Sequence, residues 1–190
     1  MDSNRKKSLY KTLEKLRQLP RKHADFFDWH NKETKEKYLC GKLMHHLLDE
    51  GGEKFESLRI GENPPDCVVE IGGEIVGIEV VEFVDQKAIE EQIRKKSLWS
   101  HQPPWTEDMV MSKLNSLIQD KNNPREKANL KEKYKRYIVL LHTDEPELDA
   151  QEFDRLFNRE LLEATDLVTE AHIIFSYDPS LKRYPVIKLF

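Results

Sequence analysis

The chain has 190 residues and a mass of 22.5 kDa, which is the size of one domain. Hydrophobic residues make up 38% of it and charged residues 35%, which predicts a packed core under a charged surface, and the low counts of Gly (7) and Pro (9) exclude a collagen-like chain. The longest aliphatic run, residues 138–141, is far shorter than the ~20 residues of a membrane span, and residues 1–20 lack the apolar stretch of a secretion signal.

Cys40 and Cys67 are the two cysteines of the sequence, and both lie in apolar surroundings. A single disulfide between them is possible, but two reduced, buried thiols are the better interpretation for a protein without a secretion signal. A zinc ribbon with four cysteine ligands is excluded. We therefore expect a cytoplasmic domain without a membrane segment.

The net charge of −4 is unevenly distributed along the chain. Residues 1–22 carry eight Lys and Arg residues against two acids, and residues 121–136 carry seven against two. Two basic segments on an acidic body favour a polyanionic partner such as nucleic acid, although both are also compatible with solvated helix surfaces.

In chain order, a basic helix is predicted over residues 5–18, followed by a longer helix over 31–49 that ends before Gly51. A polar connection is expected over residues 53–65. The hydrophobic period then changes from 3.6 to 2, which predicts two strands over 66–71 and 74–83, joined by a glycine turn.

The second half of the chain alternates between helical and strand patterns. Helices are predicted over residues 86–96, 107–121, 125–136 and 149–164, and an irregular loop over 97–106. Strands are predicted over residues 137–142, 171–177 and 186–190. This order is typical of an α/β protein with a mixed β-sheet flanked by helices. Residues 1–22 would be a basic N-terminal appendage, and residues 23–190 a single domain.

The predicted hairpin brings two carboxylates together. If Gly72 and Gly73 are its two turn residues, Asp66 falls opposite Glu79, about 5 Å away across the ladder. Alternation then places both acids on one face of the sheet and leaves the other face almost wholly apolar.

Two such acids repel one another unless a hard cation lies between them, and oxygen ligands suit magnesium or manganese. Glu36 extends the apolar stripe of the helix over 31–49 and is a possible third ligand, with Glu33 as the alternative. Carboxylates that simply point into water remain an open interpretation for all of these residues.

The segment PPDCVVEIGGEIVGIEVVEF resembles the core of the PD-(D/E)XK phosphodiesterase superfamily, whose fold is restriction-endonuclease-like. Pro65-Asp66 matches the first element of its motif, Glu79 matches the acid of the second, and the order of elements matches over residues 31–177. The resemblance implies an α-β-β-(β)-α-β core, here with an extra N-terminal helix. It also implies a magnesium or manganese ion held by Asp66, Glu79, the backbone carbonyl of Val80 and, by position, Glu36.

The motif lysine of this superfamily falls on Val81, which can supply neither a charge nor a proton. The lysine function could have moved to Lys87 in the following helix or, more remotely, to Lys121. A metal-bound hydroxide could act without it, or the fold could have become a binding module.

The resulting hypothesis is a metal-dependent nuclease that hydrolyses DNA, with Asp66, Glu79 and Lys87 as its catalytic residues. Phosphate contacts are expected from the N-terminal basic segment, through Arg5, Lys6, Lys7, Lys11 and Lys15. The alternative is an inactive nuclease-fold module that binds DNA or a protein partner. The oligomeric state is left open, and a dimer is possible.

Two further groups of residues have a functional and a structural interpretation. Trp99, His101 and Trp105 could stack on unpaired bases, but packing against their own domain is the commoner arrangement. Residues 142–145 end a buried strand with His-Thr-Asp-Glu and could gather a cation, although a solvated loop is favoured.

Overall fold

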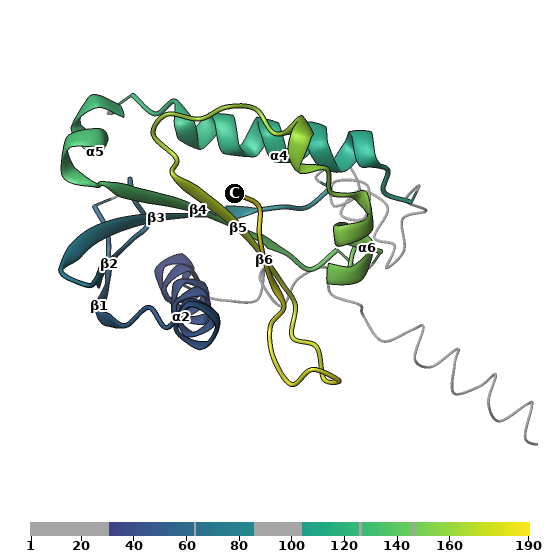
Figure 1. The fold of residues 1–190 in the computed structure, drawn as a ribbon, viewed down its shortest axis with the longest axis horizontal. Coiled ribbons are helices and arrows are strands. Elements are labelled where there is room, and N and C mark those ends of the chain that lie inside the picture. The colour runs from purple at the N-terminus through teal and green to yellow at the C-terminus, as the bar shows by residue number, and fades with distance from the viewer. Residues whose placement is uncertain (1–30, 63, 86–103, 126, 146) are drawn as a thin grey trace, which may run out of the picture.

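The structure is an α/β arrangement in which helices cover both faces of one mixed six-stranded sheet (Figure 1). It is a computed structural model, and it describes residues 31–62, 64–85, 104–125, 127–145 and 147–190. The predicted α/β class, with a mixed sheet flanked by helices, is confirmed, and the restriction-endonuclease-like core stays a prediction.

The strands lie in the sheet in the order in which they occur in the sequence. Their bounds are β1 Phe55–Ile60, β2 Cys67–Ile71, β3 Glu74–Glu82, β4 Arg136–Thr143, β5 Glu170–Phe175 and β6 Val186–Lys188. The first three form an antiparallel meander, β3, β4 and β5 are parallel, and β6 returns antiparallel to β5.

The described helices are α2 Lys32–Gly51, α4 Glu107–Asn122, α5 Lys127–Lys133 and α6 Ala150–Leu156, with a 3-10 turn at Arg159–Leu161. The side chains of Asn31, Thr106 and Asp149 cap the N-termini of α2, α4 and α6 by accepting backbone N–H bonds. Gly52 ends α2 in the left-handed conformation, with φ at 68°.

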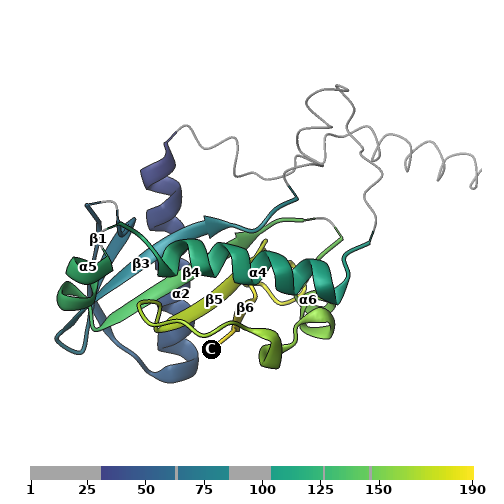
Figure 2. The same ribbon diagram turned by 90° about the horizontal axis from the view of Figure 1, so that it is seen from above.

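The helices form two layers around the sheet (Figures 1 and 2). Helix α2 lies on one face, where Leu39, Leu43 and Met44 pack against alternate residues of β2 to β5. Helices α4, α5 and α6 lie on the other face and bury a larger core with Leu114 and Phe153 at its centre. The face assignments predicted for the hairpin are confirmed, since Val68 packs toward α4, whereas Cys67 and Val69 pack toward α2.

The structure differs from the sequence predictions at several element bounds. Residues 55–60, predicted as part of a polar connection, form the edge strand β1. The predicted helix over 149–164 ends at Leu156, and that over 125–136 is limited to α5. Helix α6 is short because Phe157 and Leu162 already have extended backbone conformations, which close α6 and the following 3-10 turn.

The predicted helices over 5–18 and 86–96 lie outside the described residues, as do residues 97–103 of the predicted loop over 97–106. Within the described part of the chain, none of the helices is both long and apolar enough to cross a membrane.

Candidate functional site

The register of the β2–β3 hairpin places Asp66 beside Glu79. Cys67 pairs with Ile78 and Ile71 with Glu74, which is the predicted register. Asp66 lies one residue before these pairs, and the carboxylate of Glu79 acts on it as a neighbouring charge. The turn depends on Gly72 and Gly73, whose φ angles of 57° and 81° lie in the left-handed region that glycine adopts without strain. The glycine pair therefore sets the register that brings the two acids together.

Asp66 immediately precedes β2 and is 6% exposed. Its Oδ2 atom accepts a hydrogen bond from the backbone N–H of Val80, at 2.8 Å. Burial raises the pKa of Asp66 to about 6, against the opposing effect of the Val80 N–H, and the nearby carboxylates of Glu79 and Glu36 raise it further. Asp66 thus lies in a group of like charges.

The backbone of Asp66 is fixed by Gly61, at the end of β1. The N–H of Gly61 donates to the carbonyl oxygen of Asp66 at 2.8 Å. A Cβ atom on Gly61 would lie only 1.9 Å from the carbonyl oxygen of Pro65, so no larger residue fits without moving the chain. The edge strand, which the sequence analysis missed, therefore positions the first acid.

Glu79 is 3% exposed, and each of its carboxylate oxygens has a hydrogen-bond donor. The hydroxyl of Tyr137 donates to Oε1 at 2.9 Å. The Nζ atom of Lys121, from the last turn of α4, lies 2.8 Å from Oε2. A lysine ammonium thus reaches the acid pair from a neighbouring helix.

Tyr137 reaches Glu79 because Gly77, its register partner on β3, has no side chain. A Cβ atom on Gly77 would lie 2.9 Å from the Tyr137 ring. Burial and the charge of Glu79 raise the pKa of Tyr137, so its hydroxyl stays protonated and acts as a donor. Sequence reasoning missed this residue, because the pairing of β4 with β3 has no local sequence signal.

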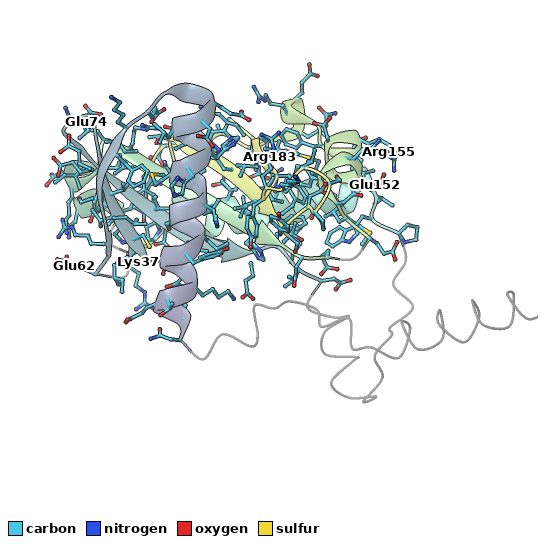
Figure 3. All side chains as sticks on the ribbon, turned by 90° about the horizontal axis from the view of Figure 1, so that it is seen from below. Lys37, Glu62, Glu74, Glu152, Arg155 and Arg183 are labelled. Atoms are coloured by element: carbon cyan, nitrogen blue, oxygen red, sulfur yellow. The ribbon has the colours of Figure 1, made fainter. Side chains whose placement is uncertain are left out.

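Glu36 approaches the acid pair from the opposite layer. It lies on α2, is 7% exposed, and borders a cleft of about 640 Å³ together with Asp66, Glu33, Ile60 and residues of the β1–β2 connection. Glu62 of this connection and Lys37 of α2 appear on the same side of the molecule in Figure 3. The cleft therefore opens between the N-terminal half of α2 and the loop before β2.

Lys32 holds Glu36 in this cleft. Its Nζ atom lies 3.2 Å from Oε1 of Glu36, one helical turn away. This hydrogen bond raises the pKa of Lys32, and the charges of Asp66 and Glu79 raise it further. The acid group thus already attracts a cation of the chain itself.

The donor chemistry at Asp66 and Glu79 fits a hard divalent cation, because the groups are carboxylates, buried and mutually repelling. In the described residues, however, no three His, Cys, Asp or Glu side chains are grouped closely enough to hold a metal ion as they stand. Val80 reaches Asp66 through its N–H, and the expected contact of its carbonyl with a metal stays a prediction.

The second basic segment is largely paired with carboxylates. Lys127 and Lys131 contact Asp166, Lys133 contacts Glu62, and Arg136 bridges Glu53 and Glu170. These positive charges are therefore compensated within the domain, which weakens the expectation that residues 121–136 bind a polyanion.

Several other expectations lie in or near undescribed segments. Lys87, Trp99, His101 and the basic residues Arg5, Lys6, Lys7, Lys11 and Lys15 are outside the described residues. Trp105 is 7% exposed, and its ring centroid lies 5.3 Å from that of Phe83, so it packs in the core, as favoured from the sequence.

The solvated loop favoured for residues 142–145 is wrong, because His142, Thr143 and Glu145 are buried, and so is the carboxylate of Asp144. Both of its oxygens are inaccessible to solvent and accept no hydrogen bond from another residue in the described segments. Burial raises the pKa of Asp144 to about 7, and the neighbouring Glu145 adds to this effect. Burial of His142 itself lowers the pKa of its imidazole to about 3, so this side chain is neutral at physiological pH.

Comparison of the chain with protein-family models, with curated proteins and with solved structures finds no match. The candidate site therefore rests on its own residues and geometry.

Proposed function

We propose that this protein is a metal-dependent nuclease that hydrolyses phosphodiester bonds in DNA, on a core related to the restriction-endonuclease-like fold. The observation that carries the proposal is the lysine at the acid pair: Lys121 Nζ lies 2.8 Å from Glu79 Oε2, and Glu79 is a neighbouring charge of Asp66. Two acids and a lysine in contact are the residue types that the resembled motif requires, although the lysine comes from α4.

Asp66 and Glu79 would hold the magnesium or manganese ion, with Glu36 as a further carboxylate at the cleft. Such an ion, when bound, polarises a phosphodiester and lowers the pKa of a bound water. The high pKa of Asp66 supports this assignment, since a nearby cation would favour its ionised form.

Lys121 is proposed to orient the attacking water and to stabilise negative charge on the phosphate. Its side chain is about one-third exposed, so the ammonium is fixed by Glu79 yet accessible to a substrate. A preorganised donor of this kind typically accelerates a reaction by about 10²–10³. Tyr137 is a positioning residue, because it acts by holding Glu79.

The second candidate function is a binding module that has lost catalysis. One observation favours it: both oxygens of Glu79 are already occupied, by Tyr137 and Lys121, as they would be in a purely structural network. In that case the network stabilises the sheet, and no metal is required.

Cleavage of single-stranded and duplex DNA in magnesium or manganese distinguishes the two. The proposal expects metal-dependent cleavage by the full chain and its loss in Glu79→Gln. Glu74→Gln is the matched control, because Glu74 lies on the same strand but is exposed and distant from the acid pair in the register. Absence of metal-dependent cleavage, or equal cleavage by Glu79→Gln, contradicts the proposal.

A further inference from the structure

A group of three tyrosines lies on the surface beside α2, away from the acid pair. Tyr38 is on α2, whereas Tyr177 and Tyr184 flank the connection between β5 and β6, and we call these three residues the tyrosine patch. The hydroxyl of Tyr38 donates to that of Tyr184 at 2.8 Å, and the ring centroids of Tyr177 and Tyr184 are 5.5 Å apart. Segments distant in sequence are thus joined by an aromatic contact.

The tyrosine patch is open to solvent. Tyr177 is 49% exposed and Tyr38 is 37% exposed, whereas Tyr184 is half-buried. The rings meet edge to face, at interplanar angles of 80° and 63°, and are not stacked on one another. A flat partner can therefore stack on the exposed ring of Tyr177.

The tyrosine patch also carries a positive charge. The Nζ atom of Lys42 lies 4.9 Å from the centroid of Tyr38 and 5.1 Å from that of Tyr184, and it makes no ion pair with a carboxylate of the described residues. The lysines of residues 127–133, in contrast, are paired with acids. Exposed Lys182 and Arg183 lie on the same connection, with Arg183 3.6 Å from Glu50.

We propose that the tyrosine patch, together with Lys42, binds a single-stranded segment of nucleic acid. Exposed aromatic rings stack on unpaired bases, which a duplex does not offer, and adjacent lysines contact the phosphates. The charge of Lys42 argues for this occupant over an apolar protein surface, which would have to bury an ammonium without a carboxylate partner.

The position of the tyrosine patch connects it to the candidate site. Glu36 and Lys42 are six residues apart on α2, which is about 9 Å along the helix axis. Lys37, on the exposed surface of α2, lies between them in sequence, and Figure 3 shows Lys37 and Arg183 on either side of this helix. A strand crossing α2 could thus touch both places. The idea that a bound single strand is also the substrate rests on the proposed nuclease function. Binding of a single strand at the tyrosine patch does not depend on that function.

The test is fluorescence anisotropy with the full chain, a labelled oligothymidine and a duplex of equal length, in EDTA so that no cleavage occurs. The chain is expected to prefer the single strand, and Tyr177→Ala to weaken single-strand binding by about tenfold with little change for the duplex. Tyr177→Phe, which keeps the ring, is expected to bind as the unmodified chain does. Leu161→Ala, at an exposed apolar residue elsewhere, is the control.

Photo-cross-linking with an oligothymidine that contains 5-iodouracil provides a second measurement, and we expect cross-links at Tyr177 or Tyr38. Cross-links confined to other residues, equal loss of single-strand and duplex binding, or an unchanged affinity of Tyr177→Ala would overturn the inference. Binding of a protein but of no oligonucleotide would overturn it as well.

The two proposals fail separately. If the chain binds single strands through Tyr177 but does not cleave them in magnesium or manganese, the proposed nuclease fails and the binding surface stands. If Glu79→Gln abolishes cleavage while Tyr177→Ala binds oligothymidine normally, the binding surface fails and the nuclease stands.

Discussion

Lys121 and Glu79 are separated by 42 residues in sequence, yet their side chains are in contact at 2.8 Å. Glu79 comes from the centre of the sheet, and Lys121 comes from the last turn of the helix that covers it. Val81, two residues after Glu79, packs against the hydrophobic core on the same face. A lysine from α4 can therefore meet the acid without a charged residue replacing Val81.

If the protein is the proposed nuclease, Lys121→Gln is expected to lower kcat for DNA cleavage by about 10²–10³, because the proposed donor to the phosphate is lost. The Kd for DNA is expected to change by less than about threefold, since one phosphate contact contributes little to total affinity. Single-turnover cleavage and anisotropy measure the two quantities.

Lys127→Gln is the matched control for this substitution, because Lys127 is also a lysine near α4 but pairs with Asp166. Its cleavage rate should equal that of the unmodified chain. A Lys121→Gln protein that cleaves at the normal rate would show that Lys121 has only a structural role.

Tyr137→Phe is expected to lower the affinity of the site for manganese by about tenfold, as is typical when a group that orients a ligand is removed. The ring remains, so the packing against Gly77 is retained, and the free energy of unfolding should fall by about 1–3 kcal/mol because a buried oxygen of Glu79 loses its donor. Isothermal titration with manganese measures the affinity, and urea unfolding measures the stability.

Tyr134→Phe provides the comparison, since Tyr134 is a similarly buried tyrosine, 6.0 Å from Tyr137 between ring centroids, without a bond to Glu79 in the described contacts. If both substitutions leave manganese affinity unchanged, Tyr137 does not position a metal ligand.

The hairpin was predictable because its signals are local. Gly72-Gly73 fixes the turn, strict alternation fixes the two faces, and together they place Asp66 opposite Glu79. Glu36 was also predictable, because its spacing from Leu39 and Leu43 puts it on the inward side of α2.

The remaining parts of the site depend on tertiary contacts. Tyr137 reaches Glu79 through the parallel pairing of β3 and β4, and Lys121 reaches it through the packing of α4. The edge strand β1 was missed because residues 55–60 show no clean alternation, and the strand contains a register shift between Phe55 and Ser57. Contacts between elements that are distant in sequence leave no hydrophobic periodicity in the sequence, so they could not be predicted from it.

Asp66→Asn is expected to stabilise the metal-free protein at pH 8 while abolishing cleavage. The pKa of Asp66 is about 6 in the folded state, above its ordinary value of 3.8. The folded state therefore binds more protons than the unfolded state between about pH 4 and 6, and stability falls as the pH rises through this window. The amide of Asp66→Asn carries no charge, so the fall in the free energy of unfolding with rising pH, about 1 kcal/mol, should be absent in this variant.

The measurement is urea unfolding of both proteins at pH 5 and pH 8 in EDTA. The amide oxygen can still accept the Val80 N–H, so the difference between the two proteins should grow with pH. A constant difference at both pH values would indicate that the ionised carboxylate of Asp66 is not strained by its neighbours.

Manganese affinity of the unmodified chain should weaken below pH 6, where Asp66 is protonated.

Asp144→Asn tests whether a buried carboxylate outside the candidate site changes stability without changing cleavage. The pKa of Asp144 is about 7 in the folded state, against an ordinary value of 3.8, because its oxygens are buried. The folded protein again binds the extra proton, so this group's contribution is present at low pH and is lost as the pH rises from about 4 to 7. Asp144→Asn should raise the free energy of unfolding at pH 8 by on the order of 2 kcal/mol and change it little at pH 4.

Cleavage and manganese affinity should be unchanged in Asp144→Asn at pH 8, unlike in Asp66→Asn, because Asp144 lies at the end of β4 and not at the Asp66–Glu79 pair. Asp154→Asn, on the exposed surface of α6, is the control for a simple change in net charge, and its free energy of unfolding should follow that of the unmodified chain at each pH. If Asp144→Asn also loses cleavage, the functional site extends along the sheet edge to β4. If the free energy of unfolding of Asp144→Asn follows that of Asp154→Asn, the Asp144 carboxylate reaches solvent in the folded protein. The pH-dependent part of the stability must then be assigned to Asp66 alone.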